Sequence, residues 1–229
     1  MSAAIFFIII LPILTFYIGT RYQQVKDLDT VVINSNTATT EANLNNEKSI
    51  VNASKLVLNS LKNKDYKTLA NMTSSQGLTV SLSPYKIFDQ EVAWINGNED
   101  SFNATSTAKK NFSREEVSRI GIDNKEYIFG NTDGKGDPIK GNTQYYFDRW
   151  VYNYDYINAP EVYLNKVQDT GNTINTINED VGSRDFILYH FPGFREEVKG
   201  FDWTSMYLIF EKENGEYKLR AIAKDNWTI

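Results

Sequence analysis

The chain has 229 residues and a formal net charge of −5, with its acidic and basic residues interspersed. A chain of this length holds one domain of ordinary size, about 100 to 150 residues, and an appendage. The absence of a basic stripe argues against nucleic acid as a partner. The absence of cysteine excludes disulfides, a lipid-modified cysteine and any Cys-ligated metal.

Residues 3–20 read AAIFFIIILPILTFYIGT and carry no charged side chain. A helix of this length spans roughly 27 Å, close to the thickness of the hydrocarbon core of a bilayer, so the run predicts a transmembrane helix. A cleaved signal peptide is the alternative, but no basic residue precedes the run and no A-x-A-like site follows it. The side chains expected to lie in lipid are Phe6, Ile9, Leu11, Leu14 and Phe16.

Residues 21–46, which follow the apolar run, indicate the orientation in the membrane and where the globular domain starts. Arg21 and Lys26 follow the run, and by the positive-inside rule they would leave the rest of the chain in the cytoplasm. Residues 27–46 are rich in Asn and Thr and are predicted to be a flexible tether, because they bury too little apolar surface to offset their ordering entropy. We therefore expect an anchor and its flank in residues 1–26 and a globular domain in residues 47–229.

Two amphipathic helices are predicted to open the domain. The first ends near Asn63, and the second is capped by Asp65 and stops at Gly77. Their buried sides carry apolar residues at helical spacing. These residues are Ile50, Val51, Val57, Leu58 and Leu61 in the first helix, and Tyr66, Leu69, Ala70 and Met72 in the second.

Further helices and strands are predicted after them. SREEVSRIG matches a capping box, Ser113 with Glu116, and Thr143 is expected to cap a helix through QYYFDRWVYN. LTVSL alternates as a strand does, and more strands are predicted at residues 162–168 and 185–191. Helices that come first and strands that come later favour an α+β fold with an antiparallel sheet over alternating βαβ units.

A hairpin is predicted near the end of the chain. Asn214 and Gly215 suit a type I′ turn, which needs positive φ at both central residues. A regular register from this turn places apolar pairs on one face, which we expect to cover the first helix. The second face is expected to meet solvent, a pocket or a partner. The pairs on the first face are Phe210 with Leu219, Leu208 with Ala221, and Met206 with Ala223, and those on the second are Glu211 with Lys218, Ile209 with Arg220, Tyr207 with Ile222, and Ser205 with Lys224.

HFPGF, DWTSMYLIFE and GEYKLRAIAKDNWTI, in this order, resemble the closing signature of a family of uncharacterised bacterial membrane-anchored or secreted proteins. NKDYKTLANM, GLTVSLSPY, DGKGDPI and YFDRWVYNYDYINAPEV are similar to the same pattern, so the resemblance covers roughly residues 47–229. It implies the cone-shaped α+β fold of the cystatin-like or nuclear-transport-factor-2-like class, in which a curved antiparallel sheet wraps around helices. It also implies a place at the bacterial cell surface, and no activity. Lys224 and Asp225 stand where the pattern leads us to expect a His-Asp pair, which puts chemistry that needs this histidine in doubt.

His190 is the only histidine, and it is a candidate general base in the mouth of the cone. Asp155, Glu161 and Asp202 each follow or precede an aromatic residue or a proline, where a carboxyl pKa can be raised, so they are candidate acidic partners. The alternative is that these residues are structural. His190 shares a strand face with Phe186 and would then be buried and hydrogen-bonded, and the three carboxylates would lie at the surface. No G-x-S-x-G motif is present, which disfavours a Ser-His-Asp triad.

Two other segments have candidate roles. NTDGKGDP offers oxygen ligands from Asn131, Asp133 and Asp137, but the residue order of an EF-hand is not met, so we predict a Gly-rich turn and no metal site. YYFDRWVYNYDYI is dense in aromatic rings, which line pockets and interfaces. In a helix, three rings share one face and are candidate ligand-binding residues for a sugar or a peptide, with packing as the alternative. They are Tyr146, Trp150 and Tyr154.

The sequence thus predicts a non-catalytic binding or interaction module without a cofactor, tethered by a single span to a bacterial cell membrane. We expect it outside the cytoplasm, as the resemblance implies, although Arg21 and Lys26 favour the opposite orientation. Its expected partners are the bilayer and an envelope protein, a peptide or a glycan. One alternative is a small enzyme, which requires His190 to meet one of the three carboxylates in a pocket of the cone. The other is a structural component of the cell envelope, which requires an exposed apolar patch around Tyr207, Ile209 and Ile222.

Overall fold

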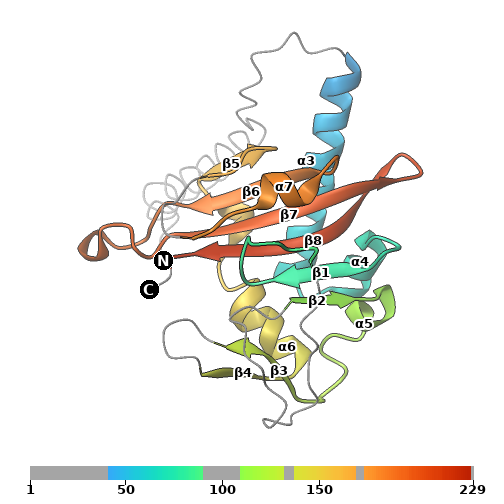
Figure 1. Ribbon diagram of the computed structural model, residues 1–229. Coiled ribbons are helices and arrows are strands. Elements are labelled where there is room, and N and C mark those ends of the chain that lie inside the picture. The colour runs from blue at the N-terminus through green and yellow to red at the C-terminus, as the bar shows by residue number, and fades with distance from the viewer. Residues whose placement is uncertain (1–40, 90–108, 132–136, 169–172, 228–229) are drawn as a thin grey trace, which may run out of the picture. The chain divides into compact units, whose positions relative to one another are not determined.

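The computed structural model describes residues 41–89, 109–131, 137–168 and 173–227. They lie in one unit that runs from Thr37 to Ile229. A six-stranded sheet has the order β2-β1-β8-β7-β6-β5, and a separate two-stranded sheet pairs β3 with β4 (Figure 1). The strands are β1 (Leu78–Ser81), β2 (Lys109–Phe112), β3 (Tyr127–Asn131), β4 (Pro138–Gly141), β5 (Glu161–Leu164), β6 (Asp185–Phe191), β7 (Thr204–Glu213) and β8 (Glu216–Asn226).

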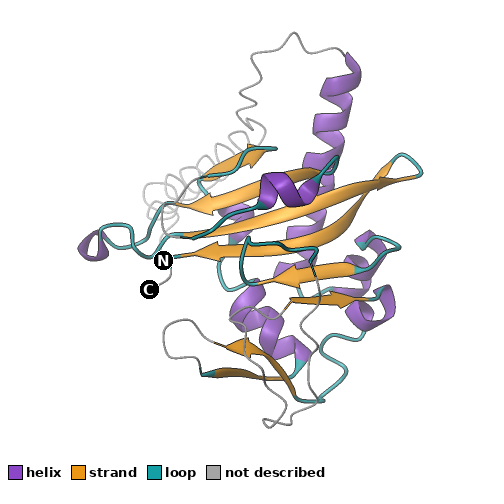
Figure 2. Cartoon of the chain, in the orientation of Figure 1, coloured by secondary structure: helices purple, strands orange, loops and turns teal. Residues whose placement is uncertain are grey.

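The helices lie on both sides of the six-stranded sheet (Figure 2). Their bounds are α3 (Glu41–Lys62), α4 (Tyr66–Met72), α5 (Arg114–Ser118), α6 (Thr143–Tyr146) and α7 (Ile177–Val181), with a π-helix at Phe147–Val151 and 3₁₀ turns at Tyr156–Asn158 and Glu196–Val198. The α+β class predicted from the sequence is confirmed, and the sheet is curved.

Helix α3 packs its apolar stripe against the first face of the sheet. Val57 and Leu58 share a buried cluster with Met206, Leu208 and Phe210 of β7, as expected from the hairpin. Helix α3 begins at Glu41, earlier than the sequence suggested. Its first turns bury little apolar surface, so hydrophobic periodicity could not reveal them.

The second face of the sheet is also buried, and this was not predicted. Helix α7 covers it with Ile177 and Val181, and Ile87 from the segment after β1 joins them. Under this cover lie Tyr207 and Ile209 of β7, which are fully buried. The exposed apolar patch that a structural role required is therefore not found at these residues.

The hairpin turns where predicted, with positive φ at Asn214 and Gly215. The register is regular from the turn as far as the pair of Phe210 with Leu219, and then shifts between Ile209 and Phe210. A β-bulge at Arg220 causes the shift, because Ile209 pairs with Ala221 and not with Arg220. Beyond the bulge every predicted pair is wrong by one residue. The observed pairs are Leu208 with Ile222, Tyr207 with Ala223, Met206 with Lys224, and Ser205 with Asp225.

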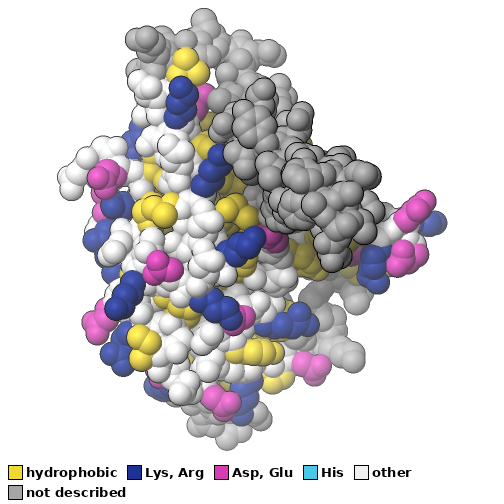
Figure 3. Space-filling view, turned by 180° about the vertical axis from the view of Figure 1, so that it is seen from behind, with side chains coloured by type: hydrophobic (Ala, Val, Ile, Leu, Met, Phe, Trp, Pro, Cys, Tyr) yellow, Lys and Arg dark blue, Asp and Glu magenta, His cyan; other side chains and the backbone are white. Residues whose placement is uncertain are grey.

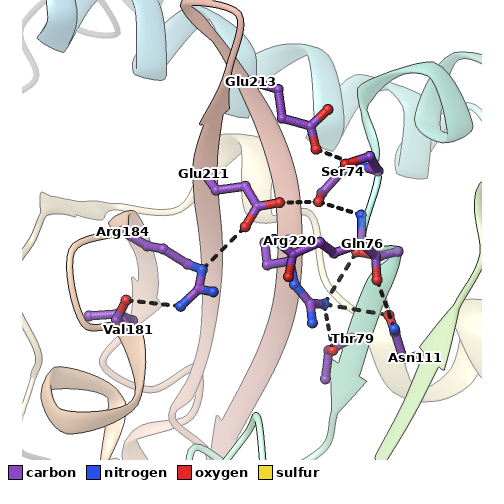
Figure 4. A network of polar contacts seen from close by, with 11 residues as sticks. Ser74, Gln76, Thr79, Asn111, Val181, Arg184, Glu211, Glu213 and Arg220 are labelled. Carbon is purple, nitrogen blue, oxygen red and sulfur yellow. Dashed lines mark hydrogen bonds and ion pairs between the residues drawn. The ribbon is translucent and has the colours of Figure 1, made fainter.

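The bulge residue is held by polar contacts on the second face (Figure 4). Arg220 donates to Thr79 Oγ1 at 2.8 Å, and its guanidinium lies 5.0 Å from the ring centroid of Phe88. Arg184 lies 4.8 Å from the same ring and bonds Glu211 at 3.4 Å. These contacts tie β8 to β1 and to the segment after it.

Strand β1 pairs in parallel with β8, through Thr79 with Ala221. The prediction of an antiparallel sheet is therefore wrong for this pair. Antiparallel neighbours can follow a tight turn, whereas parallel neighbours need a long connection. In the sequence, β1 is the first strand of this sheet and β8 is the last. Local sequence patterns carry no information on such a distant pairing.

Two of the three predicted helix caps are confirmed. Asp65 Oδ1 accepts from Thr68 N at 3.0 Å, and Ser113 and Glu116 form the capping box. The third prediction is wrong by one residue, because Asn142 and not Thr143 caps α6.

The predicted membrane-spanning segment, residues 3–20 with its anchor side chains, lies outside the described residues, as does most of the predicted tether. Among the helices that the structure does describe, none is both long enough and apolar enough to span a bilayer. Helix α3 is the longest of them, but it carries Lys48, Lys55 and Lys62. On this finding we correct the predictions of a transmembrane helix, of a single-pass architecture and of a cell-membrane localisation.

Candidate functional site

His190 lies on β6 and faces the second side of the sheet. It is buried, and its Nδ1 is 2.8 Å from Ser205 Oγ on β7. Burial lowers its pKa, while the charge of Glu161 opposes the shift. A histidine in this environment is held neutral, as the structural alternative requires.

Glu161, His190, Ser205 and Asp225 are paired in a row across β5, β6, β7 and β8. The first three stand in the order carboxylate, base and hydroxyl that activates a nucleophile in acyl transfer. However, His190 and Ser205 are both buried, and Glu161 accepts from Tyr163 OH at 3.0 Å. His190 and Ser205 bond each other and are closed off from solvent, as a structural pair is.

The other two candidate carboxylates do not meet His190. Asp155 bonds Lys62 at 2.8 Å at the end of α3. Asp202 accepts from Phe194 N at 3.0 Å and from Arg195 Nε at 3.1 Å. Both make ordinary ion pairs, so the convergence that the enzyme hypothesis required is absent among these residues.

Residues 131–138 form the glycine-rich segment that was considered as a calcium loop, and the structure describes only part of it. Asp133 lies outside the described residues, and Asp137 is exposed. Within the described part of the chain, no three His, Cys, Asp or Glu side chains gather closely enough to hold a metal ion.

Lys224 is a site residue that the sequence analysis missed. The bulge turns it toward the first face, where it is fully buried and its Nζ contacts Tyr156 OH and lies 3.2 Å from Thr204 Oγ1. Tyr156 OH and Thr204 Oγ1 are themselves 2.8 Å apart. Burial lowers the pKa of Lys224 well below its ordinary value, and the charge of Asp225 opposes this.

Asp225 is buried on the opposite face. Its Oδ1 accepts from Thr173 Oγ1 at 2.9 Å, and its Oδ2 lies 3.5 Å from Asn175 Nδ2. Burial raises its pKa to about 7, against the hydrogen bond from Thr173 and the charge of Lys224. Two charged residues in a row on a strand were the available signal, since one of them must face the core in either register.

The aromatic run divides between core and surface. Tyr146 is fully buried and stacks on Phe129 with ring centroids 4.2 Å apart. Trp150 is partly buried and packs against the same core. Tyr154 is 38% exposed. Of the three rings predicted to share one binding face, only Tyr154 is thus placed to meet a ligand, because the helix ends at Val151 and leaves Tyr154 outside it.

Tyr154 belongs to a group of exposed rings that we call the aromatic end: Tyr154, Phe194, Phe201 and Trp227. Phe194 stacks on Tyr154 at 4.7 Å, and Phe201 stacks on Trp227 at 5.3 Å. Phe194 is 46% exposed, Phe201 59% and Trp227 37%. Two of these rings come from the loop between β6 and β7, which projects beyond the sheet (Figure 2).

The loop that carries the aromatic end is braced at its neck. Gly193 and Gly200 approach so closely that a Cβ on Gly193 would lie 2.8 Å from Gly200 Cα. The two bonds accepted by Asp202 tie the start of the loop to its end. The backbone that carries Phe194 and Phe201 is therefore braced at both ends of the loop.

A hollow of about 360 Å³ lies beside the second ring pair. Phe201, Trp227 and Val198 supply apolar lining, and Glu197 and Lys199 supply charges of both signs. Three hollows among the described residues are lined by other side chains than those of His190, Glu161 and Lys224. The sequence offered one signal for this site, which is that Phe194 and Phe201 each follow a glycine, in PGF and GFDW. Sequence alone does not show that these two rings lie exposed on one loop.

The face opposite to the view of Figure 1 has a mixed surface where described residues are visible. Lys and Arg side chains are interspersed there with Asp and Glu, and apolar side chains are scattered (Figure 3). Such a mixed surface is what a solvated face normally presents.

Comparison with known proteins adds no relative to this description. No protein-family model matches the chain, and neither a curated protein nor a solved structure matches it.

Proposed function

We propose that this protein is a non-catalytic binding module that captures an extended peptide segment of a partner protein at the aromatic end. The observation that carries the proposal is the pair of exposed ring stacks, Tyr154 with Phe194 and Phe201 with Trp227, in each of which one ring stands on the braced loop. The resemblance noted in the sequence is compatible with such a role and supplies no activity of its own.

Exposed aromatic rings are costly in water and strengthen binding when a partner covers them. Each buries a large area with few rotatable bonds, which is why such rings dominate the binding energy of protein interfaces. A rim of polar and charged groups around an apolar centre is the usual anatomy of these interfaces. Lys199 and Glu197 beside Phe201 supply such a rim.

A peptide fits the site better than a small metabolite. Phe194 and Phe201 stand on the same projecting loop, and each stacks on a ring from another part of the chain. An extended chain that follows the loop would meet a ring of each pair. A preformed loop reduces the entropy lost on binding, which favours a partner that is itself flexible. The buried polar row around His190 offers no comparable access.

The test is a selection of peptides from a random displayed library against the full chain. We expect the enriched peptides to lose about tenfold or more in affinity with the double variant Phe201→Ala, Trp227→Ala, since two central rings are removed. Tyr145→Ala is the matched control, because Tyr145 is 45% exposed but lies on α6, away from the loop. Affinity is measured by calorimetry, and folding by circular dichroism.

Two results would contradict the proposal. The first is a library that yields no enriched peptide while a panel of oligosaccharides binds, which assigns the site to glycans. The second is a folded double variant that binds the selected peptides as tightly as the unchanged chain does.

A further inference from the structure

Residues 173–181 form a segment that crosses the second face of the sheet, and we call it the strap. Its helical part, α7, lies in front of β6 and β7 (Figure 1). Ile177 and Val181 are buried against Phe186 and Tyr207 in the cluster on this face. The strap thus hides an apolar surface that would otherwise meet water.

The two ends of the strap are attached differently. The C-terminal part is held by backbone contacts and by a partly exposed carboxylate. Thr176 N donates to Pro84 O at 3.0 Å, and Asp180 Oδ2 accepts from Ile87 N at 3.0 Å. Gly182 follows it, with a φ of +59° and nothing within 4 Å of an added Cβ, so the chain can pivot there.

The N-terminal end is held by one buried carboxylate. Asp225 accepts from Thr173, and Asn175 links Asp225 to Tyr207 OH, to which it donates at 3.0 Å. Asn175 Oδ1 also accepts from Ile177 N at 3.0 Å, which connects this anchor to the first turn of α7. Detaching the strap would therefore return the Asp225 carboxylate to water.

Few groups near Asp225 compensate its charge. Lys224, the next residue along β8, attracts it but faces the other side of the sheet. On the same side stand Tyr207 and Ser205 from β7 and, one strand further, His190 of β6, whose pKa is lowered by burial. The arginines on this side of the sheet, Arg184 and Arg220, bond Glu211 and Thr79. The ionised form of Asp225 is therefore poorly solvated while the strap is closed.

We propose that the strap is a pH-sensitive cover, closed while Asp225 is protonated and opening more often once Asp225 ionises. The reason is the difference in hydration between the two states. A protonated carboxyl loses little when the strap excludes water, whereas a carboxylate regains its full hydration when the strap lifts. Lys224 lies on the first face, which stays buried when the strap lifts, so its own hydration does not change with the opening.

Hydrogen exchange of the full chain between pH 6 and pH 8 tests the proposal. Rates of the amides in residues 173–184 are divided by the intrinsic rate at each pH, which leaves the opening equilibrium of the strap. With a closed-state pKa of about 7 for Asp225, we expect the population of the open strap to rise about tenfold over this range. Amides of β7 should show no such change, which confines the effect to the strap.

Two variants assign the effect to a residue. Asp225→Asn removes the ionisation, so its strap should be protected equally at pH 6 and pH 8, and better at pH 8 than in the unchanged chain. Asp180→Asn is the matched control, because it weakens the strap at its other end. It should raise exchange by a similar factor at both pH values and keep the pH dependence.

The outcomes are decisive in both directions. A strap whose corrected exchange does not change with pH in the unchanged chain would overturn the proposal, and so would a pH dependence that survives in Asp225→Asn. If Asp225→Asn fails to fold, His190→Asn decides instead. A pH dependence that persists without the histidine supports Asp225 as the titrating group, and one that disappears contradicts it.

Discussion

Lys224 and Asp225 are consecutive on β8, and both are buried on opposite faces of the same sheet. The bulge at Arg220 produces this arrangement, because it turns every following residue of the strand to the face opposite the one predicted. The sheet thus separates two charges of opposite sign that still attract each other. Each of them raises the free energy of the folded state for the same reason, which is loss of hydration.

Replacing Lys224 with methionine should stabilise the protein at neutral pH. Burial lowers the pKa of Lys224 in the folded state, so the unfolded chain binds a proton there more readily, and stability rises with pH up to the ordinary pKa of 10.5. We expect Lys224→Met to raise the free energy of unfolding by about 1 to 3 kcal/mol at pH 7. The gain should shrink toward pH 10.5.

Urea denaturation at pH 7 and pH 10 measures this effect. Tyr156 and Thr204 keep each other as hydrogen-bond partners in the variant. Lys48→Met, at an exposed position of α3, is the control and should change stability by no more than about 0.5 kcal/mol. A less stable Lys224→Met at pH 7 would show that the amine is favourable where it lies.

Glu213 should stabilise the fold at neutral pH and not in strong acid. Burial opposes its ionisation, but hydrogen bonds from Ser75 and Ser74 and the charge of Arg114 outweigh it and lower the pKa to about 2. Because this value lies below the ordinary 4.5, the stabilisation is complete above pH 4.5 and is lost as the pH falls toward 2. Glu213→Gln should therefore cost about 1 kcal/mol at pH 7 and almost nothing at pH 2.

Thermal unfolding as a function of pH measures the loss. Glu216→Gln is the control, since Glu216 is 74% exposed and its ion pair with Lys218 contributes little. A difference between Glu213→Gln and the unchanged chain that is constant from pH 2 to pH 7 would contradict this account.

Gly193→Ala should destabilise the domain and loosen the loop between β6 and β7. The residue has a φ of +145°, and an added Cβ would meet Gly200 Cα at 2.8 Å. We expect a loss of about 1 to 3 kcal/mol and faster cleavage by chymotrypsin after Phe194. Gly215→Ala has a positive φ without a steric contact and should lose only about 1 kcal/mol. Equal losses in the two variants would mean that the close approach is unimportant.

Ser205 should behave as a structural hydroxyl and not as a nucleophile. Ser205→Ala removes the partner of buried His190 Nδ1, which should cost about 1 to 2 kcal/mol. Ser183→Ala, at an exposed position, should cost much less. Mass spectrometry after treatment with a fluorophosphonate should find Ser205 unmodified, and a labelled Ser205 would revive the enzyme hypothesis.

Sequence patterns of a few residues predicted those features of the fold that depend on interactions between near neighbours in the chain. The turn at Asn214 and Gly215, the cap at Asp65 and the strand of His190 follow from side-chain and backbone preferences within a few residues. The bulge at Arg220 could not be predicted in this way. It is held by Thr79, far away in the sequence, through a parallel strand pair that no local pattern encodes.

Some residues of the candidate site could be predicted from local sequence and others could not. Tyr154 was identified from aromatic density, but the helical spacing assumed for it fails, because the π-helix ends at Val151, and Tyr146 lies in the core. Phe194 and Phe201 were missed because a loop has no periodicity that shows which side chains meet water. Asp225 was noticed only as part of a resemblance, although a Lys-Asp pair inside an apolar strand signals a buried charge.

The position of β8 constrains how the domain can fold. This strand comes after every other strand of the six-stranded sheet in the sequence, yet it lies between β1 and β7. Until it is synthesised, β1 and β2 have no connection to β5, β6 and β7, and both parts would expose unpaired edges. Contacts between segments so far apart slow folding and favour a single cooperative transition. Chaperones that shield nascent sheet edges should therefore engage this chain for longer than one whose central strands come first.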